Sequence, residues 1–382
     1  MKILLTYPKL QYDWVVSQFE NWVGGDGKTK DVAMLINGQY PGMTMAASRP
    51  IIRANLGDWI EVTVTNNLTC DGYDTYLAAG AHEGLPIPSH FEPRSIELAG
   101  STRIIGPSTP TVYSAPLKPK AARRFLFPIA DWYYGDAEVL GKELIPQPGA
   151  AHPADNVLFN GTHVNSDGGG EYYRVTMKPG KRHRLRLINP SVDISYTVSL
   201  VDHDMTVISK DFVPVNAFTA SSLFLTPRQR LDVTIDASKT SGNYWFNVIF
   251  SSLLFCSNLA EGIPPPAAIF SYENAPDPSL GHSYRFRQPP SRHVLDNLNF
   301  LPVLSQSVDS SSFFTDEDNT LLVESKPKQW EDVPDRIYWD VHGSDMNITW
   351  ENPTLEYIAN ENLDFPEKCN VHSVPNTEGE WT

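Results

Sequence analysis

The chain has 382 residues, enough for two or three domains, and its 45 acidic residues outnumber 30 basic ones to give a net charge of −15. Lys and Arg form no clustered stripe, so we expect no nucleic-acid partner. No apolar run approaches the roughly 20 residues of a membrane-spanning helix, so we expect no membrane partner either. The 31 prolines, 24 glycines and 16 tyrosines are typical of an all-β protein with many turns.

A strand–turn–strand unit occupies residues 31–65, DVAMLINGQYPGMTMAASRPIIRANLGDWIEVTVT. It predicts three strands, separated by an Asn-Gly turn at Asn37 and a Gly-Asp turn at Gly57. The last strand alternates apolar and polar residues, as a half-buried strand does. The preceding GGDGKTK at 24–30 ends like a phosphate-binding loop, but Trp22 replaces the first glycine and no helix is predicted after it. We interpret this segment as the tip of a hairpin.

The same outline recurs twice further along the chain. Residues 156–189 repeat the order strand, turn, strand, turn, strand, with an Asn-Gly turn at Asn160 and a Pro-Gly turn at Pro179. Short strands bounded by turn residues then continue to about residue 275. Residues 338–359 begin the unit again, with a His-Gly turn at His342.

The recurrence predicts an all-β fold in which one Greek-key β-sandwich module is used three times. We place the first domain at 1–145, the second at 146–275, a Pro-, Ser- and Asp-rich linker at 276–325, and a partial third domain at 326–382. A piece as short as the last one is too small to bury a core of its own. Its open strand edges would favour association with another chain.

The ten histidines show no spacing typical of a metal site, because no two of them are separated by a single residue. His183, in a strand, and His203, in a turn, are interpreted as structural imidazoles with one partner each. His82, Glu83 and His90 share one predicted loop, where they would hold a metal weakly. Solvated loop histidines are the favoured interpretation, since a metal site needs three or four converging ligands.

The cellular compartment stays open on the residues alone. Cys70, Cys256 and Cys369 contain no C-x-x-C spacing, and the first two are either a disulfide pair or two inert thiols. The opening MKILLTYPKLQYDW has an apolar stretch too short for a secretory leader and no small-residue cleavage site. N-x-[ST] sequons, which are glycosylation acceptors in secreted proteins, occur at Asn67, Asn160 and Asn347.

Several strings nonetheless carry a specific resemblance. VAMLINGQYPGMT, GDWIEVTVTNNLTCDG, PIADWYY, PGKRHRLRLINPS, SLVDHDMTVISKDFVPVNAFT, QRLDVTIDAS and NYWFNV together resemble ascomycete laccases, the fungal branch of the multicopper oxidases, over residues 13–359. The resemblance implies three cupredoxin-like sandwiches, a blue copper in domain three, and a trinuclear copper cluster between domains one and three. It implies one-electron oxidation of phenols coupled to reduction of dioxygen to water, in a family whose members are usually secreted.

Most of the copper ligands implied by the resemblance are missing. In the family, the strand that ends in NNLTCDG leads into H-W-H-G, whereas here Gly72 is followed by YDTYLAAGAHEGLPIPSHF. In the second ligand pair Pro88 replaces the first histidine and His90 matches the second. The other ligands belong to the end of domain three, which we expect the chain not to reach, and Cys369 does not represent the copper-binding cysteine. A lone imidazole does not organise a cluster, so we expect no full complement of copper and no oxidation of phenols by this chain.

One substrate feature is retained. Asp193, in INPSVDISY, occupies the position of the acidic residue that accepts a hydrogen bond from the phenol in related laccases, although an aspartate that caps the turn after Pro190 explains it equally well. Two functions therefore compete. The first is a laccase-like oxidase of aromatic metabolite biosynthesis whose sequence is incomplete, since the resemblance breaks at Gly72 and resumes near Ser89. The second is a copper-free pseudoenzyme that binds a phenolic ligand or a partner protein.

Overall fold

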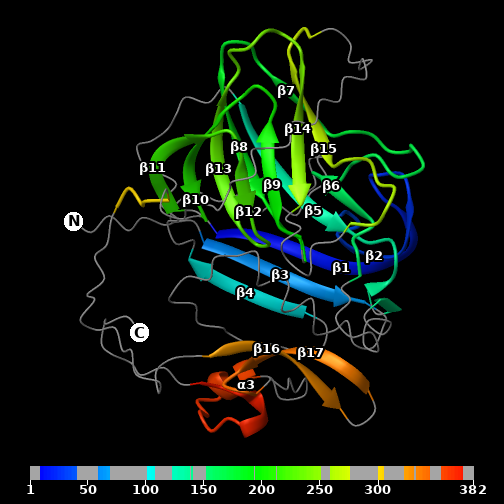
Figure 1. Cartoon of the computed structure of the whole chain (residues 1–382). Helices are drawn as coiled ribbons and strands as arrows, with labels where there is room; N and C mark the ends of the chain where they lie inside the picture. The colour runs from blue at the N-terminus through cyan, green and yellow to red at the C-terminus, as the bar shows by residue number, and fades with distance from the viewer. Residues whose placement is uncertain are drawn as a thin grey trace, which may run out of the picture. The chain divides into compact units, whose positions relative to one another are not determined.

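The computed structural model describes residues 9–40, 59–68, 101–107, 123–137, 139–140, 152–192, 194–211, 213–250, 259–275, 300–304, 322–330, 333–344 and 354–372. These residues form strands almost throughout, as predicted (Figure 1). The chain divides into two compact units, Met1–Ala137 with His152–Val303, and Glu138–Ala151 with Leu304–Thr382. Within the described ranges no helix has both the length and the apolar character needed to cross a membrane.

The N-terminal part of the first unit is a four-stranded sheet with the order β2-β1-β3-β4 (blue to cyan in Figure 1). Its strands are β1 (Lys9–Val23), β2 (Thr29–Ile36), β3 (Trp59–Asn67) and β4 (Ser101–Pro107). The predicted alternation in β3 is confirmed at Val62 and Val64, which pack with Val16 of the parallel neighbour β1. Glu61 is the exception: it is only 4% exposed, and Gln11 Nε2 donates a hydrogen bond of 3.0 Å to its carboxylate.

The rest of the first unit contains a six-stranded sheet, β11-β10-β13-β8-β5-β6, and a five-stranded sheet, β12-β9-β14-β15-β7. Strands that are neighbours in these sheets are often far apart in sequence, as in a Greek-key sandwich. The strands are β5 (Arg123–Trp132), β6 (Asn156–Phe159), β7 (Arg174–Met177), β8 (Arg182–Ile188), β9 (Tyr196–Leu200), β10 (Met205–Lys210), β11 (Val213–Ala220), β12 (Leu223–Leu225), β13 (Arg230–Asp236), β14 (Asn243–Phe250) and β15 (Ala267–Tyr272).

Phe127 of β5 lies in the core between these two sheets and is fully buried. Its ring centroid is 6.1 Å from that of Phe159, 5.7 Å from Tyr173, 5.0 Å from Phe246 and 5.7 Å from Phe270. Aromatic pairs at such distances add to the stabilisation that comes from burying their surface. The core of the sandwich therefore depends on β5.

The pairing of β5 bears on the domain boundary that the sequence predicts at residue 145. The strand pairs in parallel with β8, Phe125 opposite Leu185 and Phe127 opposite Leu187, and antiparallel with β6. The second sandwich thus begins no later than residue 123. Parallel neighbours are joined by long connections, so the local repeat pattern, which starts at residue 156, did not include this strand.

The three predicted hairpin turns share one geometry. In each, both central residues have positive φ, and the residues before and after the turn pair with each other. A two-residue type I′ turn requires this conformation, which asparagine and glycine adopt at low cost. The φ values are 52° and 72° at Asn37-Gly38, 53° and 88° at Asn160-Gly161, and 54° and 77° at His342-Gly343. The recurrence of this turn is confirmed.

The GGDGKTK segment forms the predicted hairpin tip between β1 and β2, and it packs on the sandwich through Asp26. This carboxylate is fully buried. Its Oδ2 accepts hydrogen bonds from Tyr134 Oη at 2.7 Å and Asn156 Nδ2 at 2.9 Å, and its Oδ1 accepts one from the Lys28 N–H at 3.2 Å. Asn165 Nδ2 donates to the Asp26 carbonyl at 2.8 Å. Burial and the adjacent carboxylate raise the pKa of Tyr134, so its hydroxyl remains a donor.

The approach of the hairpin tip leaves room for no side chain at Gly170. A Cβ atom there would lie 2.2 Å from the His163 carbonyl oxygen and 2.5 Å from the Asp26 carbonyl oxygen, and the residue has a φ of +74°. Both facts require glycine. Lys28 also forms an exposed ion pair with Asp167, with 3.1 Å between Nζ and Oδ2, which contributes little because water screens it.

A second contact joins the first sheet to the sandwich through aromatic rings. The Trp132 ring centroid lies 6.0 Å from that of Trp22 and 4.8 Å from that of Tyr40. Lys30 of β2 places its Nζ 5.1 Å from the centroid of the Trp132 ring and donates a hydrogen bond of 2.5 Å to the Tyr133 carbonyl. Burial lowers the pKa of Lys30. Together with the Asp26 contacts, this cluster fixes the hairpin against the end of β5.

His163 lies in the sandwich behind the hairpin tip and is fully buried. Asn156 Nδ2 donates to Asp26 and to the Val164 carbonyl, so its Oδ1 faces His163 and accepts from Nδ1 at 2.9 Å. The Ala267 N–H donates to the other ring nitrogen at 3.4 Å. His163 is therefore neutral with its proton on Nδ1, and burial lowers its pKa to about 4.

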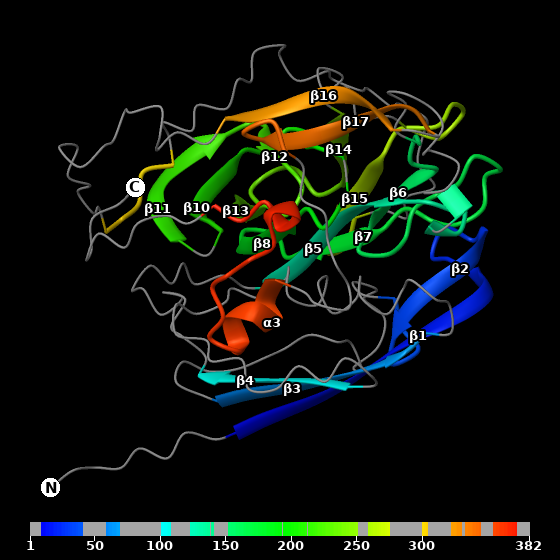
Figure 2. The same cartoon turned by 90° about the horizontal axis from the view of Figure 1, so that it is seen from below.

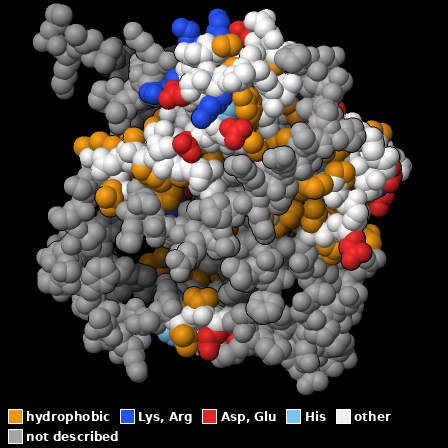
Figure 3. All heavy atoms as spheres, turned by 45° about the horizontal axis from the view of Figure 1, so that its top comes forward, with side chains coloured by type: hydrophobic (Ala, Val, Ile, Leu, Met, Phe, Trp, Pro, Cys, Tyr) orange, Lys and Arg blue, Asp and Glu red, His pale blue; other side chains and the backbone are white. Residues whose placement is uncertain are grey.

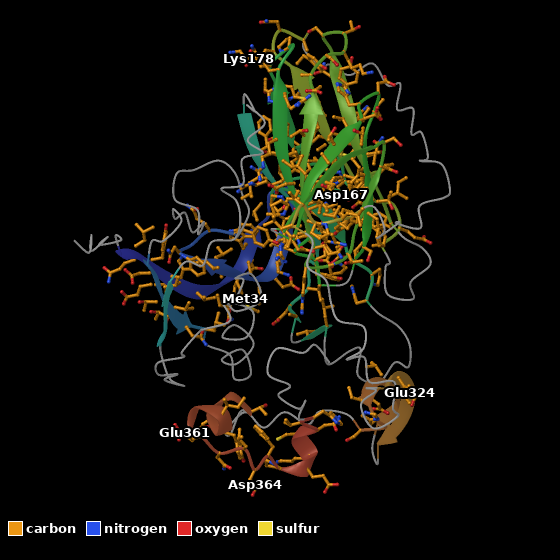
Figure 4. The ribbon with its side chains drawn as sticks, turned by 90° about the vertical axis from the view of Figure 1, so that its left-hand side faces the viewer. Met34, Asp167, Lys178, Glu324, Glu361 and Asp364 are labelled. Atoms are coloured by element: carbon orange, nitrogen blue, oxygen red, sulfur yellow. The ribbon has the colours of Figure 1, made fainter. Side chains whose placement is uncertain are left out.

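Figure 3 shows Lys and Arg side chains gathered at one end of the described surface. The exposed Lys178 and Lys181 lie in the turn between β7 and β8, and the exposed Arg182 begins β8. Arg182 is paired with Asp236, with 2.7 Å between Nε and Oδ1. Figure 4 labels Lys178 at this end and Asp167 well below it. The cations are few and partly neutralised, unlike a phosphate-binding stripe.

The second unit contains β16 (Val323–Trp330) and β17 (Val333–Val341), an antiparallel pair, followed by the helix α3 (Thr354–Ala359) and the 3-10 helix η4 (Glu367–Cys369) (orange and red in Figure 2). Residues 354–359 lie in the expected third copy of the strand unit, but they are helical, with Glu356 in the first turn where it interacts favourably with the helix dipole. Cys369, in η4, is a buried free thiol.

We predict that residues 123–304 fold as a cooperative β unit and that residues 146–304 do not. Loss of β5 removes Phe127 and its neighbours, and deleting one such ring alone costs about 3–5 kcal/mol, a large share of the ~5–15 kcal/mol that holds a typical domain together. Thermal denaturation followed by circular dichroism compares the two fragments. Phe127→Ala in the longer fragment measures what this ring alone contributes to stability. Equal melting temperatures of the two fragments would contradict a sandwich that includes β5.

We also predict a stability change in acid that originates at His163. Its pKa is about 4 in the folded chain against 6.5 as the ordinary value, so the unfolded state takes up the proton first as the pH falls through this window. The free energy of unfolding should drop by about 3 kcal/mol between these limits. Urea titrations of wild type and His163→Gln test this, with the exposed His342→Gln as control. An unchanged pH slope in His163→Gln would show that another group is responsible.

Candidate functional site

The residues predicted for substrate and metal binding lie outside the described residues. This holds for His82, Glu83, His90 and Asp193, for the sequon Asn347, and for Cys70 and Cys256. The immediate neighbours of Asp193 are described on both sides, in the loop Asn189–Ser195 between β8 and β9. We call this segment the 189–195 loop.

Asn189 holds both ends of the 189–195 loop. It is buried, and its Oδ1 accepts a hydrogen bond of 3.0 Å from the Ser191 N–H. Its Nδ2 donates to the Ile194 carbonyl at 2.9 Å and to the Leu225 carbonyl at 3.1 Å. The side chain therefore forms the local Asx turn expected after Asn-Pro and also ties position 194 to β12.

Asp131, near the end of β5, forms hydrogen bonds to Ser191 and Val192 in the middle of the loop. Its carboxylate is 7% exposed and accepts the Val192 N–H at 3.1 Å through Oδ1. Its backbone N–H donates to Ser191 Oγ at 3.1 Å, and Ser191 Oγ lies 2.6 Å from the buried Tyr196 Oη. Every hydrogen-bonding group of this contact is thus matched, which a buried network requires.

Two tyrosines near Asp131 have raised pKa values. Burial raises the pKa of Tyr196 well above its ordinary value, and Asp131 raises it further. The pKa of Tyr40 rises for the same two reasons, burial first and Asp131 second.

Val192, in the 189–195 loop, is 84% exposed, whereas Ser191 and Ile194 are buried. Loops held on a rigid scaffold often carry binding residues. By sequence, the residue that follows Val192 is Asp193, a carboxylate. Sequence reasoning identified Asp193 but missed Asp131, whose only signal is its place in the PIADWYY string.

The described histidines show whether copper fits this part of the chain. His183 Nε2 accepts the Lys178 N–H at 2.9 Å, and His203 Nε2 lies 2.8 Å from Tyr272 Oη. Burial lowers the pKa of His203. Both are structural, as interpreted, and His163 is occupied at both nitrogens. Among the residues that the structure describes, no three His, Cys, Asp or Glu side chains gather closely enough to hold a metal ion.

Two of the three sequons can be compared with the structure. Asn67, at the end of β3, is exposed and accessible to a glycan. Asn160 is only 2% exposed, in the turn after β6, and neither of its amide atoms has a hydrogen-bond partner among the described residues. A glycan on the amide nitrogen needs access to solvent, so the burial of Asn160 favours its role as a turn residue over the predicted glycosylation site.

Comparison with known proteins gives consistent matches. The family model described as "Multicopper oxidase" matches residues 123–275, which begin at β5. A laccase of Cryphonectria parasitica is 36% identical over 98% of this chain and 65% of its own length. Laccase-1 of Melanocarpus albomyces is 39% identical over 97% of this chain and 61% of its own length. The chain thus spans 61–65% of these relatives.

Solved structures agree in fold. The crystal structure of a laccase from Botrytis aclada has a TM-score of 0.67 at 21% identity and covers 95% of this chain, which in turn covers 69% of that structure. Fet3p, described as a multicopper oxidase that functions in iron import, has a TM-score of 0.60 at 15% identity over 89% of this chain and 64% of its own. These likenesses confirm the predicted cupredoxin-like sandwich fold.

We predict that Asp131→Ala loosens the 189–195 loop without unfolding the sandwich. The change removes the acceptor of the part-buried Val192 N–H, and a typical hydrogen bond contributes about 0.5–1.5 kcal/mol. Amide exchange of residues 189–196, measured by mass spectrometry, should become faster while the exchange of β14 stays unchanged. Asp131→Asn, which keeps an acceptor oxygen, is the matched control. Exchange in Asp131→Ala equal to that of wild type would show that the carboxylate does not hold the loop.

Proposed function

Because this chain belongs to the multicopper oxidase family, on the fungal laccase side, we propose that it is a laccase-like protein that binds a phenolic compound at the 189–195 loop. Oxidation of that phenol with reduction of dioxygen, in fungal aromatic metabolism, is the activity we propose for the complete ligand set. We further propose that the 382 residues alone bind the phenol without oxidising it.

The observation that carries the proposal is the anchoring of the loop by Asp131 and Asn189. The Val192 N–H donates to Asp131 Oδ1 at 3.1 Å, and the Ile194 carbonyl accepts from Asn189 Nδ2 at 2.9 Å. The backbone on both sides of Asp193 is therefore held. A phenol hydroxyl would donate its hydrogen to the Asp193 carboxylate, and its ring would contact the exposed Val192. A hydrogen bond to an ionised acceptor is among the stronger ones that a protein offers to a neutral ligand.

Copper would supply the one-electron oxidation and the reduction of dioxygen in this family, but the donor set of this chain does not fit it. The ten histidines include no His-x-His pair, and His90 alone matches a ligand position of the family. A copper ion requires two or three imidazoles or a thiolate in fixed geometry. The proposed role of these residues is therefore to bind and orient the phenol.

The second candidate is a copper-free pseudoenzyme, and the same missing ligands favour it. Such a protein would use the 189–195 loop to hold a phenolic ligand, or to present it to a partner protein, without any turnover. The two candidates differ in one respect: restored ligand segments would produce oxidase activity in the first and leave the second inactive.

Titration of a simple methoxyphenol, followed by ligand line broadening in NMR, tests the binding proposal. Asp193→Asn should bind at least about tenfold more weakly, because it removes a hydrogen bond to a charged acceptor. The exposed Asp167→Asn is the matched control and should bind as wild type does. Equal affinity of Asp193→Asn and wild type would remove the carboxylate from the proposal.

Oxygen uptake with the same phenol tests the second part. The 382-residue chain supplied with copper should show no uptake above that of free copper, and no blue thiolate absorption. Blue colour together with turnover would contradict the proposal. Activity that appears when H-W-H-G follows Gly72 and the remaining family ligands are supplied would separate the laccase-like oxidase from the pseudoenzyme.

A further inference from the structure

Two exposed histidines meet in the second unit. His342 lies in the turn after β17, and His372 lies three residues after the end of η4. Their ring centroids are 5.2 Å apart and their planes are inclined by 48°. Thirty positions separate them in sequence, and neither occupies a position where the family resemblance places a copper ligand. The ring nitrogens of His342 form no hydrogen bond within the described part of the chain.

Asn370 holds this arrangement together. Its Nδ2 donates to the Ser344 carbonyl at 2.8 Å and to the Val341 carbonyl at 3.3 Å, so it fastens the segment after η4 to the turn that carries His342. The residue has a φ of 47°, in the left-handed region that asparagine tolerates. The side chain of Asn370 thus connects the two backbone segments that carry the histidines.

The same amide fixes the tautomer of His372. Because both contacts of the Asn370 amide nitrogen are with carbonyl oxygens, its Oδ1 is the atom that faces His372 Nε2, at 3.0 Å. An amide oxygen accepts but does not donate, so Nε2 must carry the hydrogen. In the neutral ring, Nδ1 then carries a free lone pair. Metal-binding histidines are oriented in this way, with the second ring nitrogen donating to a carbonyl or amide oxygen.

The spacing of the rings also suits a shared ion. Two imidazoles that bind a tetrahedral ion through nitrogens about 2.1 Å from it hold their ring centroids roughly 5 Å apart. The observed centroid distance of 5.2 Å is close to this value. Both rings are exposed, so water molecules can complete the coordination shell.

We propose that His342 and His372 form a binding site for a divalent transition-metal ion, zinc or copper, with Asn370 as its positioning residue. The bound ion would cross-link the turn after β17 to the segment after η4. Two imidazoles with water ligands provide no thiolate and no second metal, so the site would stabilise the second unit rather than take part in electron transfer. Protons compete for the same lone pairs, so binding weakens in acid.

Isothermal titration of the full chain with zinc chloride, and separately with copper chloride, tests the site. The background carries His82→Asn and His90→Asn, so that the loop histidines do not contribute. We expect one ion per chain, with copper bound more tightly than zinc. Either His342→Asn or His372→Asn should weaken binding at least about tenfold, and His152→Asn, a histidine outside the site, should not. Unchanged binding in the double variant of His342 and His372 would overturn the proposal.

A second measurement does not depend on the folding of any variant. Substoichiometric copper should broaden the ring-proton NMR signals of His342 and His372 in wild type before those of the other histidines.

Asn370→Ala should weaken zinc binding by about tenfold while both ligands are retained, because the tautomer of His372 is no longer fixed. Broadening that begins at other histidines, or full affinity in Asn370→Ala together with full affinity in the His variants, would place the ion elsewhere.

Discussion

The arrangement of the first unit depends on one buried carboxylate, that of Asp26. Burying a charge is costly unless each oxygen finds a donor, and here Tyr134, Asn156 and a backbone N–H supply them. The side chain of Asn156 continues this line of hydrogen bonds. Its Oδ1 accepts from His163 Nδ1 and so sets the tautomer of His163, whose Nε2 accepts the N–H of Ala267 in β15. A single line of hydrogen bonds thus links the first sheet to both sheets of the sandwich, and a shifted hairpin would leave Tyr134 and Asn156 without the carboxylate of Asp26.

Strand β5 transmits this order to the candidate site. Phe127 and Asp131 are four positions apart and so share one face of the strand: Phe127 fills the core, and Asp131 forms a hydrogen bond to the 189–195 loop. Tyr134, just beyond the strand, bonds to Asp26. The same strand that completes the core therefore also holds a loop with an exposed residue, Val192.

The sequence predicts those parts of the fold whose signals are local. Positive φ at Asn37, Asn160 and His342 follows from the turn residues themselves, and burial of Val62 follows from a period of two. Features that depend on distant partners were missed or misplaced. The pairing of β5 with β8 was not predicted, because this parallel neighbour begins 59 positions later. Burial of Asp26 was missed because a Gly-Asp-Gly tip is elsewhere an exposed turn.

The described histidines show why the presence of imidazoles does not by itself make a copper protein. A ring binds a metal only with a free lone pair and room for an ion, and in His163 and His203 the fold has used both nitrogens for hydrogen bonds. Burial then penalises any further charge. His342 and His372 differ in both respects, since each is exposed and each retains a nitrogen that bonds to nothing in the described chain. The proposed metal site therefore lies at the turn after β17, which Asn370 connects to the segment after η4, and not in the sandwich, where these imidazole nitrogens already form hydrogen bonds.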